Sequence, residues 1–363
     1  MVPLPVDIRA DIGKMKKKPV LFTEIYIALL FACSVYILLD QFVIVREMAA
    51  VLTPTPIVTE QTPTETMVLE SEVKETETEE PSPALSLPIN AVLPQLPQDE
   101  VLLIQPEPSK PTAEVSAEVV AAEEVAEQLT EPQVTLSEIR IYDTNVHIAE
   151  IRIPDGSYLR TALANNTYGR NIKQTVKDMA QEHDALIAVN GDYFGFRNGG
   201  YVIRGGVLYR DAIFDNEQED LCIWPDGSMT VIHETEVSAQ SLMDQGVKEV
   251  LSFGPALVLD GEIQISQGLE VGTYSDDNPR TVIAQIEPLH YYFVVSDGRT
   301  DKDKGLTLYQ LAELLQGMGA QLVYNLDGGG TSTMVYNNEI INFPTARGYY
   351  EERRVSDIVY ISR

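Results

Sequence analysis

The residues whose types and spacing are best suited to chemistry lie in Tyr324–Val335, where an aspartate precedes three glycines and three hydroxyl residues. The apolar run Leu322–Leu326 predicts a buried strand that ends at the carboxylate of Asp327. Consecutive glycines let a backbone approach a ligand closely and aim several N–H groups at one point, which suits an anion. A loose loop is the alternative interpretation of a glycine run taken alone. We expect an anion cradle beside Asp327, made of Gly328, Gly329 and Gly330 with Ser332 and Thr333.

Further motifs accompany this run. The block Ala188–Phe194 reads AVNGDYF, Ser296–Arg299 reads SDGR, and Glu352–Val355 reads ERRV, while Gly305–Leu308 leads into a predicted helix. In this order and spacing the motifs resemble the phosphodiester glycosidase (NAGPA) domain family. The resemblance covers roughly residues 135–363 and implies a hydrolase that cleaves the glycosidic C–O bond of a sugar-1-phosphodiester.

The chain departs from the family pattern at one position. Family members often read Asn-Gly-Gly-Phe-Phe, whereas this chain reads Asn190-Gly191-Asp192-Tyr193-Phe194. The additional carboxylate of Asp192 is either a ligand or acid–base group, or a tolerated variation. In the structural alternative, the side chain of Asp192 simply caps a turn.

The chemistry implied by the resemblance requires few types of side chain. Hydrolysis at an anomeric carbon passes through an oxocarbenium-like state, which a carboxylate stabilises or attacks. A phosphodiester leaves as a stable anion, so holding the phosphate with arginines and N–H groups matters more than protonating the leaving oxygen. The expected catalytic carboxylates are Asp327, Asp297 and Asp192. The expected substrate-binding residues, besides the glycine cradle, are Asn190, Arg280, Arg299, Arg204 and Arg353.

Several of these assignments have a structural alternative. Asp297-Gly298 is also an ordinary turn sequence after a strand. Arg353-Arg354 is equally typical of a solvated surface pair. Arg280 opens an apolar strand directly after Pro279, a position that a surface role explains less well.

The sequence gives little support for a metal or cofactor. The four histidines lack the spacing of metal ligands, so no histidine-based metal site is expected; they are His147, His183, His233 and His290. Carboxylates around Asp192 and Asp327 leave Ca²⁺ as an open alternative. The sequence contains no Ser-His-Asp elbow and no Walker loop, and we expect no required cofactor.

Composition divides the chain into a tail at 1–18, an apolar segment at 19–45, a linker at 46–134 and a domain at 135–363. Residues 49–132 contain 17 acidic residues, 2 basic residues and no aromatic residue. Such a stretch buries too little apolar surface to offset its ordering entropy, so we expect it to be disordered. The net charge of −29 argues against nucleic acid as a partner.

Residues 19–45 have the length and apolar character expected of a transmembrane helix in contact with a lipid bilayer. Four lysines lie between Lys14 and Lys18, so the positive-inside rule places the N-terminus in the cytoplasm and the domain outside the cell membrane. A cleaved signal peptide is the alternative. Because Cys33 and Cys222 lie in separate segments, we expect no intramolecular disulfide, and this favours a bacterial cell surface.

Strand patterns outnumber helix patterns in the domain, and we predict an α+β fold with a large mixed β-sheet and a few packed helices. Strands are expected at 185–189, 280–286, 291–295, 322–326 and 356–361, hairpins at 136–153, 202–208, 221–232 and 256–263, and helices at 174–183, 239–247 and 307–318. A capping box of Thr307 and Gln310 marks the start of the last helix. Strands that end at Asn190, Asp297 and Asp327 should converge on one sheet edge.

Three functional hypotheses follow. The first is a surface-anchored glycosidase acting on sugar-1-phosphodiester bonds in cell-wall or capsular glycopolymers. The second is a glycoside hydrolase on ordinary glycans, which requires a positioned general acid, with Asp192 as the candidate. The third is a non-catalytic glycan-binding or envelope-assembly module, which requires neither Asp327 nor Asp297.

Overall fold

The computed structural model describes residues 18–51, 129–269, 277–346 and 348–363. All of the described residues belong to one compact unit of the chain. The expected tail, except for its last residue, and most of the expected linker lie outside the described residues. The disorder predicted for the linker therefore stays a prediction.

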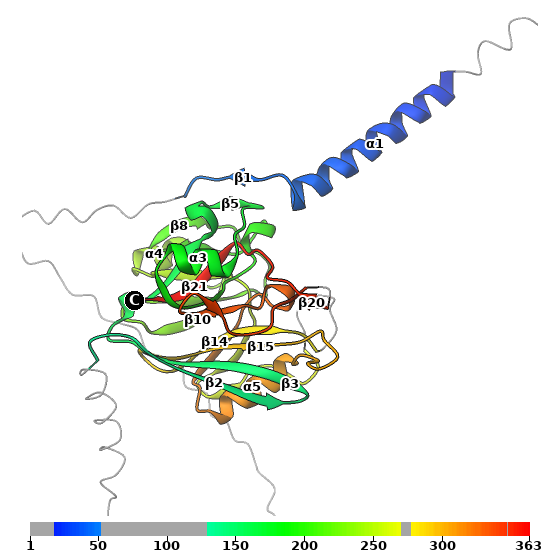
Figure 1. The fold of residues 1–363 in the computed structure, drawn as a ribbon. Coiled ribbons are helices and arrows are strands. Elements are labelled where there is room, and N and C mark those ends of the chain that lie inside the picture. Colours follow the sequence, from blue (N-terminus) through cyan, green and yellow to red (C-terminus); the bar gives the residue numbers. More distant parts are fainter. Residues whose placement is uncertain (1–17, 52–128, 270–276, 347) are drawn as a thin grey trace, which may run out of the picture. The chain divides into compact units, whose positions relative to one another are not determined.

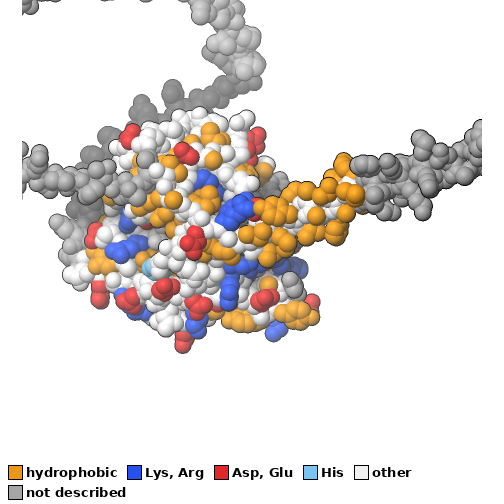
Figure 2. All heavy atoms as spheres, turned by 90° about the horizontal axis from the view of Figure 1, so that it is seen from above, with side chains coloured by type: hydrophobic (Ala, Val, Ile, Leu, Met, Phe, Trp, Pro, Cys, Tyr) orange, Lys and Arg blue, Asp and Glu red, His pale blue; other side chains and the backbone are white. Residues whose placement is uncertain are grey.

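Helix α1 (Lys18–Phe42) and the short strand β1 (Arg46–Glu47) form the N-terminal part of this unit. Apolar side chains stand exposed along α1 (Figure 2), and that of Phe31 is 71% exposed. Within the described residues, no helix combines the length and the apolar character required to cross a membrane. Residues 46–51, which fall in the predicted linker, belong instead to an ordered segment that begins with β1.

The domain is built on three sheets, and every pairing among the described strands is antiparallel. The largest sheet has seven strands. Their order is β13 (Glu262–Ile263), β12 (Ala256–Leu259), β16 (Leu322–Asn325), β14 (Arg280–Glu287), β15 (His290–Ser296), β3 (Thr144–Arg152) and β2 (Gln133–Ile141).

The other two sheets have five strands each. The first has the order β18 (Glu339–Ile340), β17 (Met334–Tyr336), β6 (Ala185–Asn190), β21 (Asp357–Ser362) and β4 (Leu159–Leu163). The second has the order β10 (Met229–His233), β9 (Glu219–Ile223), β11 (Glu249–Leu251), β7 (Val202–Arg204) and β8 (Val207–Arg210). Two-stranded pairs join β1 to β5 (Gly169–Arg170) and β19 (Thr345–Ala346) to β20 (Tyr349–Tyr350).

Apolar side chains from all three sheets form one central cluster, which includes Ile151 and Phe293 of the seven-stranded sheet, Val189 of β6 and Leu221 of β9. A helix packs on the outer side of each sheet. Helix α5 (Leu308–Gly317) covers the seven-stranded sheet, α3 (Val176–Glu182) packs against β6 and β21, and α4 (Ala239–Asp244) packs against β7 and β9 (Figure 1).

The α+β class is confirmed, but the expectation of one large mixed sheet is wrong. Short turns connect several of the consecutive strands, and strands joined in this way pair antiparallel. The expected hairpins are all present, as are the three expected helices. Strands β4 and β17 were not anticipated; β17 begins at Met334, after the three hydroxyl residues that follow the glycine run.

The capping box of α5 forms as expected and positions a residue of the site. Thr307 Oγ1 accepts from the Gln310 N–H at 3.1 Å, and Gln310 Oε1 accepts from the Thr307 N–H at 3.0 Å. This fixes the turn just before the helix, where the carbonyl of Leu306 accepts a 2.9 Å hydrogen bond from Arg280 Nε. The start of one helix therefore orients a side chain at the start of β14.

The expected convergence of strand ends on one sheet edge is observed for β15 and β16, whereas β6 belongs to another sheet. Arg280 at the start of β14 pairs with Ser296 at the end of β15, and Asn325 at the end of β16 pairs with Val282. These strand ends therefore lie at one edge of the seven-stranded sheet. The end of β6 reaches the same place from another sheet, as the contacts of its last residue show below.

Candidate active site

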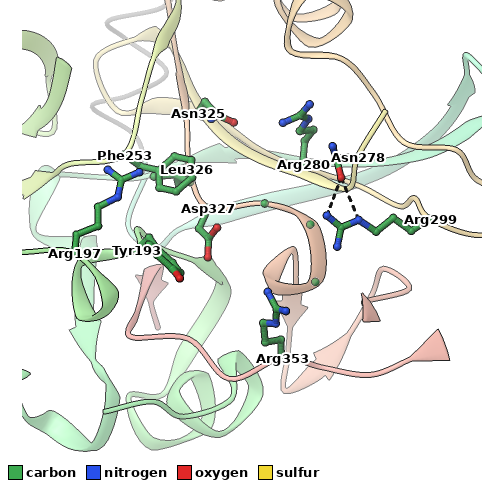
Figure 3. A pocket seen from close by; sticks show the side chains of 13 residues that line it. Tyr193, Arg197, Phe253, Asn278, Arg280, Arg299, Asn325, Leu326, Asp327 and Arg353 are labelled. Carbon is green, nitrogen blue, oxygen red and sulfur yellow. Dashed lines mark hydrogen bonds between the residues drawn. The ribbon is translucent and has the colours of Figure 1, made fainter. Parts of the chain in front are cut away.

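A cavity of about 360 Å³ lies at this sheet edge (Figure 3). Its wall includes the carboxylate of Asp327, the glycine run, four arginines and two aromatic residues. The lining residues are Tyr193, Arg197, Phe253, Asn278, Arg280, Arg299, Asn325, Leu326, Asp327, Gly328, Gly329, Gly330 and Arg353.

The cavity has two chemically different sides, with Asp327 between them. Figure 3 shows Arg197, Phe253 and Tyr193 on one side of this aspartate, and Arg280 and Arg299 with Asn278 on the other. One side is therefore largely aromatic and the other largely cationic. Such a division suits a ligand that has an apolar ring face and an anionic group.

Among the described residues, Asp327 is the only carboxylate that lines this cavity. Burial raises the pKa of Asp327 to about 6, while hydrogen bonding by Thr331 and the positive charges of Arg353 and Arg197 oppose the rise. Because an ordinary aspartate titrates near 3.8, this group changes charge much closer to neutrality. Perturbed carboxylates of this kind are common at functional sites.

Asn190 holds the backbone of this aspartate in place. Its side-chain Nδ2 donates a 2.6 Å hydrogen bond to the carbonyl of Asp327, and its Oδ1 accepts from Thr281 Oγ1 at 2.8 Å and from the Thr333 N–H at 3.2 Å. Asn190 is fully buried and does not line the cavity. It was expected to bind substrate, and the structure places it behind the site.

Arg280 and Arg299 lie in the cavity wall, as expected for a clamp. Arg280 is oriented by its bond to the carbonyl of Leu306. Arg299 donates from Nε at 3.1 Å and from Nη2 at 2.8 Å to Oδ1 of Asn278. Two guanidinium groups are thereby held on the same side of the carboxylate of Asp327 (Figure 3).

The glycine run lines the cavity, but its N–H groups are not all available to a ligand. The N–H of Gly329 donates to the carbonyl of Pro279 at 2.7 Å. Gly329 has a φ of +67°, and a Cβ there would lie 2.8 Å from Nη2 of Arg299. A Cβ on Gly330 would lie 3.4 Å from Nε of Arg353. At Gly329 and Gly330 the absence of a side chain therefore leaves room for the guanidinium groups of Arg299 and Arg353.

The expected hydroxyl members of the cradle lie elsewhere. Ser332 and Thr333 are buried and are not among the cavity lining residues. Within the described part of the chain, neither side-chain hydroxyl has a hydrogen-bond partner. Thr331, which was not singled out, instead donates from Oγ1 to the carbonyl of Gly328 at 2.7 Å and contributes to the environment of Asp327.

A second cavity of about 350 Å³ adjoins the first and shares Tyr193, Asp327 and Arg353 with it. Its remaining lining residues are Lys173, Asp192, Phe196, Thr331, Arg354, Val355 and Ser356. Asp327 is therefore exposed to two adjoining spaces. A ligand that occupies both would pass directly over its carboxylate.

Asp192 lines the second cavity but is committed to an ion pair. Arg204 Nη2 donates to Asp192 Oδ2 at 2.8 Å and to Asp357 Oδ2 at 2.7 Å, and all three side chains are buried. Asp192 also accepts from the N–H groups of Phe194 and Ser252. The aspartate that departs from the family pattern thus has its own buried arginine, and Arg204 lies outside the cavity lining.

The second carboxylate that pairs with Arg204 is that of Asp357, which is fully buried. Burial, followed by the negative charge of Asp192, raises the pKa of Asp357 to about 8, although the pairing with Arg204 opposes the rise. Two carboxylates thus share a single guanidinium group. Sharing of this kind favours the protonated form of one of them.

Asp297 is placed away from the cavity. Its Oδ2 lies 3.2 Å from Nε2 of His147, and its Oδ1 accepts a 2.8 Å hydrogen bond from the Phe343 N–H. It is buried and absent from the lining of both cavities. The structure therefore brings Asp327 together with Arg280, Arg299 and Arg353, but not with Asp297.

The sequence leaves Ca²⁺ as an open alternative at Asp192 and Asp327. Among the described residues, no group of three or more His, Cys, Asp or Glu side chains is arranged to hold a metal ion. The Asp192 oxygens already accept from Arg204 and from backbone N–H groups. The residues present do not fit a calcium site, which normally supplies six or more oxygen ligands.

Sequence reasoning missed several lining residues. Asn278 lies two residues before the strand that carries Arg280, and Tyr193 lies within the AVNGDYF block, so a motif lay nearby in both cases. Arg197 and Phe253 follow no such pattern. The guanidinium carbon of Arg197 lies 4.9 Å from the ring centroid of Phe253, a contact that only the fold creates.

Comparison with known proteins agrees with this fold and site. Residues 183–362 match the family model described as phosphodiester glycosidase. The matched region contains Asn190, Asp327 and all four arginines of the cavity wall. Residues 183–362 therefore form a domain of the phosphodiester glycosidase family.

Individual relatives match over about half of this chain. A SPbeta prophage-derived uncharacterized protein, YomE, of Bacillus subtilis is 30% identical over 181 residues, which cover 48% of this chain and 28% of that protein. The mouse N-acetylglucosamine-1-phosphodiester α-N-acetylglucosaminidase is 26% identical over 188 residues, covering 48% and 36%. The chain thus spans only about a third of the length of these relatives.

A solved structure shares the fold. The catalytic domain of the zebrafish N-acetylglucosamine-1-phosphodiester α-N-acetylglucosaminidase, described as auto-inhibited by its pro-peptide, aligns with a TM-score of 0.52 and 22% identity. The alignment covers 64% of this chain and 83% of the zebrafish domain. At this identity the likeness establishes the fold alone.

Proposed function

We propose that the domain is a hydrolase that cleaves the glycosidic C–O bond of sugar-1-phosphodiesters. The observation that carries the proposal is the position of Asp327, a half-buried carboxylate between an aromatic and a cationic side of one cavity and open to a second cavity. A phosphodiester-linked sugar has a matching arrangement, because its anomeric carbon lies between a ring and an anion.

In this mechanism the sugar ring packs on the side of Tyr193 and Phe253, and the phosphate binds on the side of Arg280 and Arg299. Asp327, as the carboxylate, stabilises the positive charge that develops at the anomeric carbon. The arginines stabilise the departing phosphate, which needs little protonation.

Asn190 and Asp297 act in this proposal as positioning residues. Asn190 fixes the backbone of Asp327, and Asp297 fixes the loop at Phe343. A glycoside hydrolase on uncharged glycans would need Asp192 as a general acid. That role is disfavoured because both oxygens of Asp192 already accept hydrogen bonds from Arg204 or from backbone N–H groups. A binding module would not require a carboxylate with a raised pKa in the cavity wall.

We further propose that the enzyme acts on glycopolymers of a cell wall or capsule, from a cell membrane anchor at residues 19–45. The proposal is supported by the exposed apolar side chains of α1 and by the lysines that precede it. Protease added to intact cells should cleave the chain within residues 52–128. A domain that stays protected until the cells are lysed would contradict this topology.

The reaction itself is tested with two substrates of the same sugar. The purified chain should hydrolyse a sugar-1-phosphodiester and release the free sugar, with a kcat/KM at least tenfold above that for the matching neutral alkyl glycoside. Asp327→Asn provides the matched inactive control. Absence of turnover on any sugar-1-phosphodiester, together with turnover of neutral glycosides, would favour the second hypothesis.

A further inference from the structure

The segment that follows α1 is bound to the domain along its backbone. Strand β1 pairs antiparallel with β5, so that Arg46 lies opposite Arg170 and Glu47 opposite Gly169 (Figure 1). The N–H of Met48 then donates to the carbonyl of Tyr168 at 2.9 Å. Residues 43–51 are called the docking strand below.

The docking strand also reaches the five-stranded sheet that contains β7 and β8. The N–H of Val51 donates to the carbonyl of Leu208 at 2.7 Å. Leu208 lies in β8, which is an edge strand of its sheet. Exposed edges are common sites of strand addition, and covering them with another segment is a usual solution.

Side chains of the domain recognise the end of α1 as well. Asn171 has a φ of +58°, and its Nδ2 donates to the carbonyls of Asp40 at 3.1 Å and Ile44 at 2.8 Å. The carboxylate of Asp40 pairs with Arg46 and lies 3.9 Å from Arg170. These contacts bind the backbone and the charge at the point where the helix ends.

Gly169 shows that the fit depends on close approach. A Cβ at this position would overlap the backbone carbonyl of Arg46. Gly169 has no left-handed φ that would by itself require glycine. The absence of a side chain therefore serves the approach of the docking strand.

We infer that the docking strand is an intramolecular latch that holds the domain at the end of α1. Residues 52–128 then connect two points on the same domain and do not set its distance from α1. None of the residues 43–51 lines either cavity, so the latched state leaves Asp327 accessible. The latch is independent of the proposed reaction, because it rests on different residues.

Hydrogen–deuterium exchange of the full chain in detergent solution tests the latch. In the wild type, peptides covering 43–51 should exchange at least tenfold more slowly than unstructured chain. Met48→Pro removes the donor to Tyr168 without changing the domain, and should abolish this protection. Met48→Ala keeps the N–H and is the matched control, with protection retained.

A second variant approaches the same contact from the domain. Asn171→Asp removes the side-chain amide that donates to the carbonyls of Asp40 and Ile44. It should raise exchange across 43–51 at least tenfold while β6 stays protected. Asn165→Asp, at an exposed asparagine with a φ of +52°, is its control. Unprotected 43–51 in the wild type, or protection that persists in both Met48→Pro and Asn171→Asp, would overturn the inference.

Discussion

The side-chain amide of Asn190 donates a 2.6 Å hydrogen bond to the backbone carbonyl of Asp327, and this bond joins the ends of two strands from different sheets. Asn190 ends β6 in a five-stranded sheet, whereas Asp327 follows β16 in the seven-stranded sheet. Two motifs far apart in sequence are thereby fixed to each other. The carboxylate of Asp327 is held in the cavity wall by a residue that does not itself touch the cavity.

Replacing Asp327 by asparagine should abolish most of the activity. Asparagine has nearly the same shape but cannot offset the positive charge that develops at the anomeric carbon. We expect kcat to fall by roughly 10³-fold on a sugar-1-phosphodiester, as for the loss of a major electrostatic group. The melting temperature should be unchanged or raised, because the variant buries no charge. A kcat within tenfold of wild type would remove Asp327 from the mechanism.

The activity should also depend on pH through this same group. The pKa of Asp327 is raised to about 6, and the carboxylate is the active form, so kcat/KM should fall tenfold per unit below pH 6. Arg353→Gln removes a positive charge that lowers this pKa, so its acid limb should move to higher pH. An activity that instead falls as the pH rises through 6 would mean that the protonated acid is the working form.

Gly329→Ala should affect the anionic part of the substrate. The added Cβ would crowd the guanidinium of Arg299 at 2.8 Å and displace it. We expect kcat/KM for a sugar-1-phosphodiester to fall by about 30-fold, which corresponds to about 2 kcal/mol for one charge-assisted hydrogen bond. A neutral aryl glycoside of the same sugar should lose much less.

A matched control separates crowding from backbone strain. Gly206 has a φ of +73°, close to the +67° of Gly329, but a Cβ there would meet nothing within 4 Å. Gly206→Ala should therefore reproduce the strain without the effect on phosphate. Equal losses on both substrates in Gly329→Ala would mean that the glycines shape the sugar side and not the anion side.

The buried pair of carboxylates at Arg204 should make stability depend on pH. Because the folded-state pKa of Asp357 is raised to about 8 from 3.8, its stabilising contribution is full below about 3.8 and is lost as the pH rises through 8. Asp357→Asn removes this titration. Its melting temperature should fall less than that of the wild type between pH 6 and pH 9 in thermal unfolding. Parallel curves for the two proteins would show that Asp357 is not protonated in the folded state.

The sequence supports the fold class and the principal motif because both depend on local patterns. Apolar alternation predicts the hairpins, and the strand that stops at Asp327 places this carboxylate at a sheet edge. The aromatic side of the cavity wall, in contrast, depends on long-range contacts. Arg197 and Phe253 meet only because two distant segments pack together, and neither has a neighbouring motif.

The predicted site residues that lie outside the first cavity share one physical cause. Asp192, Asp297 and Arg204 are charged residues next to strand ends, and sequence alone does not distinguish a charge that faces a cavity from one that is paired inside the protein. The partner of Arg204 at Asp357 lies 153 positions away. Residues 46–51 illustrate the same limit, since their pairing with β5 has no counterpart in local composition.

Hydrolysis of a sugar-1-phosphodiester in ¹⁸O-labelled water tests the proposed reaction most directly. If Asp327 stabilises positive charge at the anomeric carbon, water attacks that carbon and the C–O bond breaks. Mass spectrometry should then find the label in the released sugar and none in the phosphate. Label in the phosphate would mean that the P–O bond breaks, and would contradict the assignment of the domain as a glycosidase.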